Sequence, residues 1–299
     1  MKRTVYSVLA LLLLFSSAML LRASLPQVAT GTWAPGASMT EARTGASMAE
    51  LQDGRVLATG GTMAAGGITN AAEVFDPASN SWSAMTSVMQ DPRSGHSASV
   101  MKDGRVLLAG GENSGGVINS LEIYDPSADS FSSAGTLLAA RKNHGAAVLP
   151  DGRVWMVGGT DGTNALASTE IYDPVAGTVS AGPNLPEPRS GLSATTLLDG
   201  TVLIAGGTNT NGDLASTWIY DSTAGSFTPG ASLSAARSGH TAILLPNNNE
   251  VLIAGGSAAG TDLASAELYV PWTGAVQATA PMSAARSGGA GSEIGRAHV

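Results

Sequence analysis

A Gly-Gly pair recurs at almost constant intervals along this chain of 299 residues. The steps between successive pairs are 50, 48, 48 and 49 residues, and the pairs are Gly60-Gly61, Gly110-Gly111, Gly158-Gly159, Gly206-Gly207 and Gly255-Gly256. A period of this length, combined with strand-like segments, is typical of proteins built from copies of one supersecondary unit. The period therefore constrains the fold more strongly than any single residue does.

The first half of each unit has the pattern of a β-hairpin. A short segment of small residues, such as 96–101, suits a strand in a place where backbones crowd together. Asp103-Gly104 and its equivalents in three other copies follow, and this dipeptide predicts a tight turn with both residues at positive φ. In the fifth copy residues 247–249 are all asparagine, which predicts a turn that is one residue longer. The next run, such as 106–109, is apolar throughout, which predicts a strand covered on both faces.

The second half of each unit predicts two more strands. After the Gly-Gly pair and a variable loop comes an alternating segment such as 122–124, which Asp-Pro closes in the first three copies. One bulky residue marks the fourth strand, and in the five copies it is Trp82, Phe131, Val179, Phe227 or Val276. Four antiparallel strands per unit, repeated radially, predict a β-propeller.

These marks resemble the kelch repeat family. The resemblance rests on the Gly-Gly pair, the Tyr-Asp-Pro strand end, the bulky residue after it and the arginine that opens the next unit. The Asp-Gly-Arg-Val-Leu motif is most similar to sequences of the bacterial, galactose-oxidase-like branch of this family. The resemblance implies an all-β, kelch-type β-propeller with five complete four-stranded blades. The departures from the pattern are Asp221-Ser222, Val270-Pro271 and valine at positions 179 and 276.

Parts of further units lie at both ends of the repeat region, which spans 31–291. Residues 31–33 have the pattern of the fourth strand of a unit, but the first three strands of that unit do not precede them. At the other end, a sixth unit begins at Arg286. We therefore expect an orphan N-terminal strand, the start of a sixth blade and a piece missing from a ring of at least six blades. Residues 292–299 do not continue the repeat, and we interpret them as a non-native tail.

The N-terminal segment 1–23 has the pattern of a signal peptide. A basic start at Lys2-Arg3 precedes an apolar run and small residues suited to cleavage. An uncleaved anchor is the alternative, because 5–21 has about the minimum length for a membrane helix. Either interpretation predicts a secreted, periplasmic or cell-surface protein, which contacts a membrane only through this segment if it is uncleaved.

Composition excludes several classes of function. The net charge of −8 argues against a nucleic-acid partner, because binding to phosphates needs a surplus of lysine and arginine. The chain has no cysteine, which excludes disulfides, thiolate metal sites and cysteine nucleophiles.

An arginine before the first strand is the most regular polar feature of the repeat. Equivalent residues of a propeller lie on a circle, so these side chains are expected to ring one face near the channel mouth. Guanidinium groups bind carboxylates bidentately, which suits an acidic ligand. The alternative is structural, with each arginine paired to Glu122, Glu170 or their equivalents, or to backbone carbonyls. The candidate ligand-binding arginines are Arg43, Arg93, Arg141, Arg189 and Arg237.

Histidine completes the candidate ring in three units, at His96, His144 and His240, whereas Ala46 and Leu192 replace it in two others. Three histidines around an axis could hold zinc or copper. The incomplete set favours local hydrogen bonding at the start of a strand, so we expect neither a metal site nor a cofactor.

No residue is singled out as catalytic. The resemblance to galactose-oxidase-like enzymes implies a copper site with a tyrosine cross-linked to cysteine, and this chain has no cysteine. The sequence therefore predicts an exported binding or scaffold module for a glycan, an acidic small molecule or a protein. The variable loops after the Gly-Gly pairs are candidates for the residues that determine binding specificity, and the alternative is that they are plain solvent-exposed connections. The alternative function is a carbohydrate-active kelch enzyme, oxidase- or epimerase-like, with site residues missing from this sequence.

Overall fold

The computed structural model describes residues 36–245 and 247–291, and the regular structure of this part is entirely β. None of the described residues forms a helix that is long and apolar enough to cross a bilayer. The predicted signal or anchor segment 1–23, the orphan strand at 31–33 and the tail 292–299 lie outside the described residues.

Five antiparallel sheets of four strands form the blades. The first contains β2 (Ser47–Glu50), β3 (Val56–Thr59), β5 (Ala72–Asp76) and β6 (Ser81–Ala84), and the second contains β7 (Ser97–Val100), β8 (Val106–Ala109), β11 (Ser120–Asp125) and β12 (Ser130–Thr136). The third contains β13 (Gly145–Val148), β14 (Val154–Val157), β15 (Thr169–Asp173) and β16 (Thr178–Ala181). The fourth contains β17 (Ser193–Thr196), β18 (Val202–Ala205), β21 (Thr217–Asp221) and β22 (Ser226–Pro229), and the fifth contains β23 (Thr241–Leu245), β24 (Glu250–Ala254), β27 (Ala266–Val270) and β28 (Ala275–Thr279).

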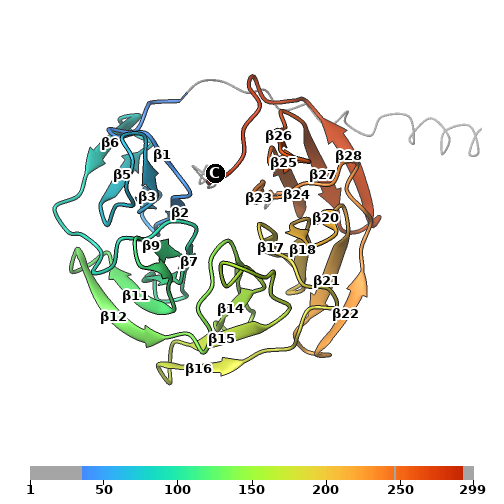
Figure 1. The fold of residues 1–299 in the computed structure, drawn as a ribbon, viewed down its shortest axis with the longest axis horizontal. Helices are drawn as coiled ribbons and strands as arrows, with labels where there is room; N and C mark the ends of the chain where they lie inside the picture. Colours follow the sequence, from blue (N-terminus) through green and yellow to red (C-terminus); the bar gives the residue numbers. More distant parts are fainter. Residues whose placement is uncertain (1–35, 246, 292–299) are drawn as a thin grey trace, which may run out of the picture. The chain divides into compact units, whose positions relative to one another are not determined.

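The blades follow one another around a centre, with their first strands innermost and their fourth strands outermost (Figure 1). The second strands of the first four blades are buried along their whole length, as their apolar sequences predict. The fourth strands are mostly exposed, and their single bulky residue lies opposite the aromatic residue of the third strand. Tyr124 and Phe131, for example, have ring centroids 4.9 Å apart. The predicted order of strands within a unit is confirmed.

Short hairpins occupy some of the loops that follow the Gly-Gly pairs, which the sequence did not predict as strands. They are formed by β9 (Glu112–Asn113) with β10 (Gly116–Val117), β19 (Thr208–Asn209) with β20 (Gly212–Asp213), and β25 (Ser257–Ala258) with β26 (Thr261–Asp262). In the first unit β4 (Thr62–Met63) pairs instead with β1 (Arg43–Thr44).

The Asp-Gly turns differ in one respect from the prediction. Gly54 has φ +83°, but Asp53 is not among the residues at positive φ, so the expectation for both turn residues is wrong. The amide of Gly54 donates to the Leu51 carbonyl at 2.9 Å, and the amide of Leu51 donates to the Arg55 carbonyl at 2.7 Å. Because the turn is closed by these two hydrogen bonds, only the glycine needs the left-handed conformation.

The hydrophobic core lies between neighbouring blades rather than within one of them. Trp155 of the third blade, for example, lies 4.4 Å from the Tyr220 ring of the fourth, measured between centroids. The face of the fifth blade that points away from the fourth carries a much smaller cluster, in which Leu252 is only partly buried. Its counterpart Leu203, between the fourth and fifth blades, is 1% exposed.

Six residues around the axis form a closed circle of backbone hydrogen bonds. Each donates its amide to the carbonyl of the preceding member with N···O distances of 2.7–3.2 Å, and the members are Gly45, Gly95, Asn143, Gly191, Gly239 and Gly288. Five members precede the first strands of the five blades. Gly288 supplies the sixth, and the Thr241 hydroxyl donates to the carbonyl of Gly289 as Ser47 donates to that of His96. The segment after Arg286 therefore occupies the place of the start of a sixth blade.

Candidate functional site

The arginine side chains that open the five complete units are buried and bound within the protein, whereas Arg286 is exposed. The Arg141 guanidinium donates to the carbonyls of Gly158 and Ser168 at 2.7 and 3.0 Å, and to Glu170 Oε1 at 2.6 Å. The same arrangement joins Arg43 to Glu73, Arg93 to Glu122 and Arg237 to Glu267, and the exposure of these arginine side chains is at most 1%. The structural alternative considered from the sequence is thus present in these four units.

The glutamates fix the chain where it enters each blade. Glu170 accepts hydrogen bonds from the backbone amides of Leu138 and Ala139 at 2.6 and 3.0 Å. These amides belong to the connection that precedes Arg141. The Arg–Glu pair therefore joins that connection to the second and third strands of the blade.

Arg189 differs because Trp218 occupies the position of the partner glutamate. Its Nη2 atom instead lies 3.1 Å from Glu187, which is two residues earlier and partly exposed. Burial lowers the pKa of Arg189, and Glu187 opposes this effect. None of the five candidate arginines lines the central cavity of the propeller.

The three histidines lie at the interfaces between neighbouring blades. Their Nε2 atoms are each 2.9 Å from a hydroxyl of the preceding blade, and the pairs are His96 with Thr59, His144 with Ser97, and His240 with Ser193. Burial lowers the pKa of His144 and of His240 to about 3, and it lowers the pKa of His96 well below the usual value. The imidazoles are therefore neutral at physiological pH.

The hydrogen-bonding role predicted for these histidines is present, but one ring nitrogen of each is left over. Among the described residues, the buried Nδ1 atoms have no hydrogen-bond partner. The same part of the chain contains no cluster of three histidine, aspartate or glutamate side chains suited to a metal ion. Where Leu192 replaces histidine, the preceding blade has Gly145 instead of a hydroxyl residue, so the apolar side chain leaves no hydroxyl without a partner.

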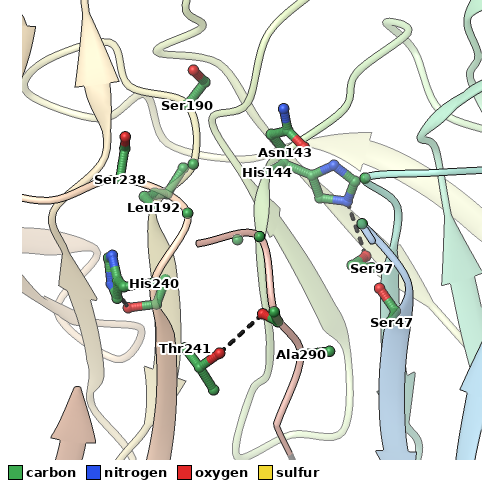
Figure 2. Close-up of a pocket in the computed structure, with 18 of the residues that line it drawn as sticks. Ser47, Ser97, Asn143, His144, Ser190, Leu192, Ser238, His240, Thr241 and Ala290 are labelled. Carbon is green, nitrogen blue, oxygen red and sulfur yellow. Dashed lines mark hydrogen bonds between the residues drawn. The ribbon is translucent and has the colours of Figure 1, made fainter. Parts of the chain in front are cut away.

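A central cavity of about 490 Å³ is bounded by the first strands of all five blades, the circle of backbone hydrogen bonds and the segment 287–291. Figure 2 shows Ser190 and Ser238 toward one end of this cavity, and Ser47, Ser97 and Thr241 toward the other. All three histidines contribute to its wall. The hydroxyl-bearing residues of the lining are Ser47, Ser97, Ser190, Ser193, Thr208, Ser238, Thr241, Ser257 and Ser287.

The lining is uncharged and combines hydroxyl groups with apolar side chains such as Met48 and Leu192. No aspartate, glutamate, lysine or arginine of the described residues contributes to it. Six of the nine hydroxyls already form a hydrogen bond within the protein. A hydroxyl that donates in this way can still accept a hydrogen bond, and Asn143 adds an amide that both donates and accepts. The surface is therefore chemically suited to a neutral ligand rich in hydrogen-bonding groups.

The sequence alone does not single out these hydroxyls, because serine and threonine are common in every loop. A signal exists in the period, since the lining residues Ser190, Ser238 and Ser287 all follow the opening arginine directly. That position becomes informative only once the radial arrangement of the blades is known.

Radial four-stranded blades, with a Gly-Gly pair after each second strand and a buried arginine at each blade entry, define a kelch-type β-propeller. The family model for the KLHDC2/KLHL20/DRC7 Kelch-repeats domain matches residues 45–256, and the chain belongs to this family.

Among solved structures, the chain is similar to that of YjhT. The TM-score is 0.73 at 18% sequence identity, and the alignment covers 85% of this chain and 89% of that chain. At this identity the likeness establishes the fold alone. No curated protein matches the chain.

Proposed function

We propose that this kelch propeller is a binding module that takes a neutral glycan in its central cavity. The observation that carries the proposal is the uncharged, hydroxyl-rich lining of a cavity of about 490 Å³. This volume is within the usual range of small-molecule sites. Neutral sugars present many hydroxyl groups and no charge, so they match the uncharged hydrogen-bonding groups of the wall.

An acidic small molecule is less well supported as the ligand. Carboxylates are best bound by guanidinium groups that are free to form two parallel hydrogen bonds. In this protein four of the candidate guanidinium groups bind buried glutamates and backbone carbonyls, as in Arg93 with Glu122 at 2.5 Å. The fifth, Arg189, binds backbone carbonyls and the partly exposed Glu187. We therefore propose a neutral molecule rather than an acidic one as the ligand.

A catalytic role in the same cavity has no specific observation in its favour. The imidazoles that reach the wall have pKa values far below neutrality, which makes them weak bases. Export remains part of the proposal and rests on the signal-like pattern of residues 1–23.

The test is an array of neutral and uronic-acid-containing glycans probed with the full chain and two variants. Ala146→Phe places a ring at the cavity wall, and Val175→Phe adds the same ring to an outer turn, where Val175 is 96% exposed. We expect the wild type and Val175→Phe to bind the same neutral glycans, and Ala146→Phe to lose at least tenfold in affinity. The proposal fails if the wild type binds only acidic glycans or none, or if folded Ala146→Phe binds like the wild type.

A further inference from the structure

The circle of backbone hydrogen bonds contains one residue that is not glycine. All six members have φ between 51° and 65°, which is the left-handed region, and the value for Asn143 is 51°. Glycine adopts this conformation without steric cost, whereas other residues lose roughly 1 kcal/mol or more. Asparagine tolerates it better than most residues do, but the other five positions indicate that the circle itself needs no side chain.

The Asn143 side chain is exposed at the cavity wall. The backbone amide and carbonyl of Asn143 complete the circle with Gly95 and Gly191. Its side-chain amide makes no hydrogen bond to any of the described residues 36–245 and 247–291. The amide therefore has two donors and one acceptor available to a ligand.

The neighbouring member of the circle makes room for this amide. A Cβ atom added to Gly95 would lie 2.5 Å from Asn143 Oδ1, so the side chain lies directly over Gly95. Figure 2 shows Asn143 beside His144, at the same end of the cavity as Ser190 and Ser238. The circle is thus symmetric in its backbone and asymmetric in its side chains, with the asymmetry at the entry to the third blade.

We propose that Asn143 determines which neutral sugar the cavity accepts, an inference that rests on the proposed function. An amide offers a donor and an acceptor side by side, which matches two adjacent hydroxyls of a pyranose ring. The hydroxyl groups elsewhere on the wall occur in several blades, so they hold a sugar in several orientations. The amide occurs once, so it selects one orientation and one stereochemistry of the adjacent hydroxyls.

The test compares Asn143→Gly with Asn80→Gly. Glycine suits the backbone at both positions, since Asn80 has φ 49° and lies in the exposed turn between β5 and β6. The probes are the methyl glycosides of mannose, galactose and glucose, which differ in the orientation of adjacent hydroxyls, titrated by calorimetry. We expect the wild type and Asn80→Gly to prefer the same glycoside. Asn143→Gly should bind this glycoside at least tenfold more weakly and lose the preference, with an unchanged or higher melting temperature.

The outcomes separate the two proposals. If Asn143→Gly keeps the affinity within twofold and keeps the order of preference, the inference is wrong while the cavity remains the binding site. If the wild type binds none of the probes and no neutral glycan on the array, the proposed function fails and the inference fails with it. A loss of affinity that is equal in Asn143→Gly and Asn80→Gly also contradicts the inference.

Discussion

Arg141→Met tests whether the buried arginines hold the propeller together. The substitution keeps an apolar stem of similar length but removes the hydrogen bonds to Gly158, Ser168 and Glu170. It leaves the Glu170 carboxylate, whose side chain is 3% exposed, without its counter-charge. Removal of one partner from a buried ion pair costs about 3–5 kcal/mol of the free energy of unfolding.

A loss of similar size is expected from the carbonyls of Gly158 and Ser168, which no longer accept hydrogen bonds from Arg141. Two buried carbonyls lose a donor, and each such loss costs about 1–3 kcal/mol. The backbone amides of Leu138 and Ala139 still donate hydrogen bonds to Glu170. The cost of leaving this carboxylate without the arginine is therefore reduced, and the loss in the free energy of unfolding stays near the value of about 3–5 kcal/mol given above. At about 2–4 °C per kcal/mol, the melting temperature should fall by roughly 6–20 °C.

The matched control is Arg153→Met in the hairpin of the same blade. Arg153 also forms an ion pair, with Asp151 at 2.7 Å, but its side chain is 41% exposed. An exposed pair contributes at most about 1 kcal/mol. Both variants are measured by urea denaturation and scanning calorimetry. If the two variants lose stability by the same amount, the assignment of a structural role to the arginines is wrong.

Three further outcomes are expected. Because burial lowers the pKa of His144 to about 3, only the unfolded chain takes up this proton between about pH 6.5 and 3. The free energy of unfolding should therefore fall as the pH drops below about 6.5, by about 2 kcal/mol at pH 5 for this group. Urea titrations of His144→Leu should show a weaker pH dependence, and an unchanged slope would contradict the assignment. Gly206→Ala should lower the free energy of unfolding by more than about 3 kcal/mol, because the new Cβ would lie 2.5 Å from the carbonyl oxygen of Arg237. Gly212→Ala should lower it by only about 1 kcal/mol, because its new Cβ meets no atom within 4 Å. Leu203→Ala should lower the free energy of unfolding by about 2–5 kcal/mol, and Leu252→Ala should lower it distinctly less, since only Leu203 is fully buried between two blades. Thermal unfolding of both variants measures the difference. Equal losses of stability would indicate that the outer face of the fifth blade is covered.

The strand order within a unit was predictable because each strand carries a local signal. The apolar run 106–109, for example, predicted a strand covered on both faces, and the structure buries it completely. The short hairpins after the Gly-Gly pairs were not predictable, because they consist of polar residues without alternation. In the second unit the pairing includes Gly116 at the start of β10, whose φ of 117° favours glycine.

The candidate site was only partly predictable. The period identified the positions of the histidines, and all three reach the cavity wall. It could not decide the direction in which an arginine side chain points, because an outward glutamate partner and an inward ligand both fit the same spacing. Asn143 was not predictable because a single asparagine among loop residues has no local signal. Its significance lies in its left-handed backbone and in the five glycines that share its place in the ring.

The closed circle of backbone hydrogen bonds also sets a limit on how binding can change. The circle has no free end, so its circumference is fixed by the number of members and the length of a hydrogen bond. Substitution of a lining side chain alters the chemistry of the mouth but not the backbone aperture. A wider backbone aperture would require more members in the circle, whereas the stereochemical preference proposed for the cavity would change with the single residue Asn143.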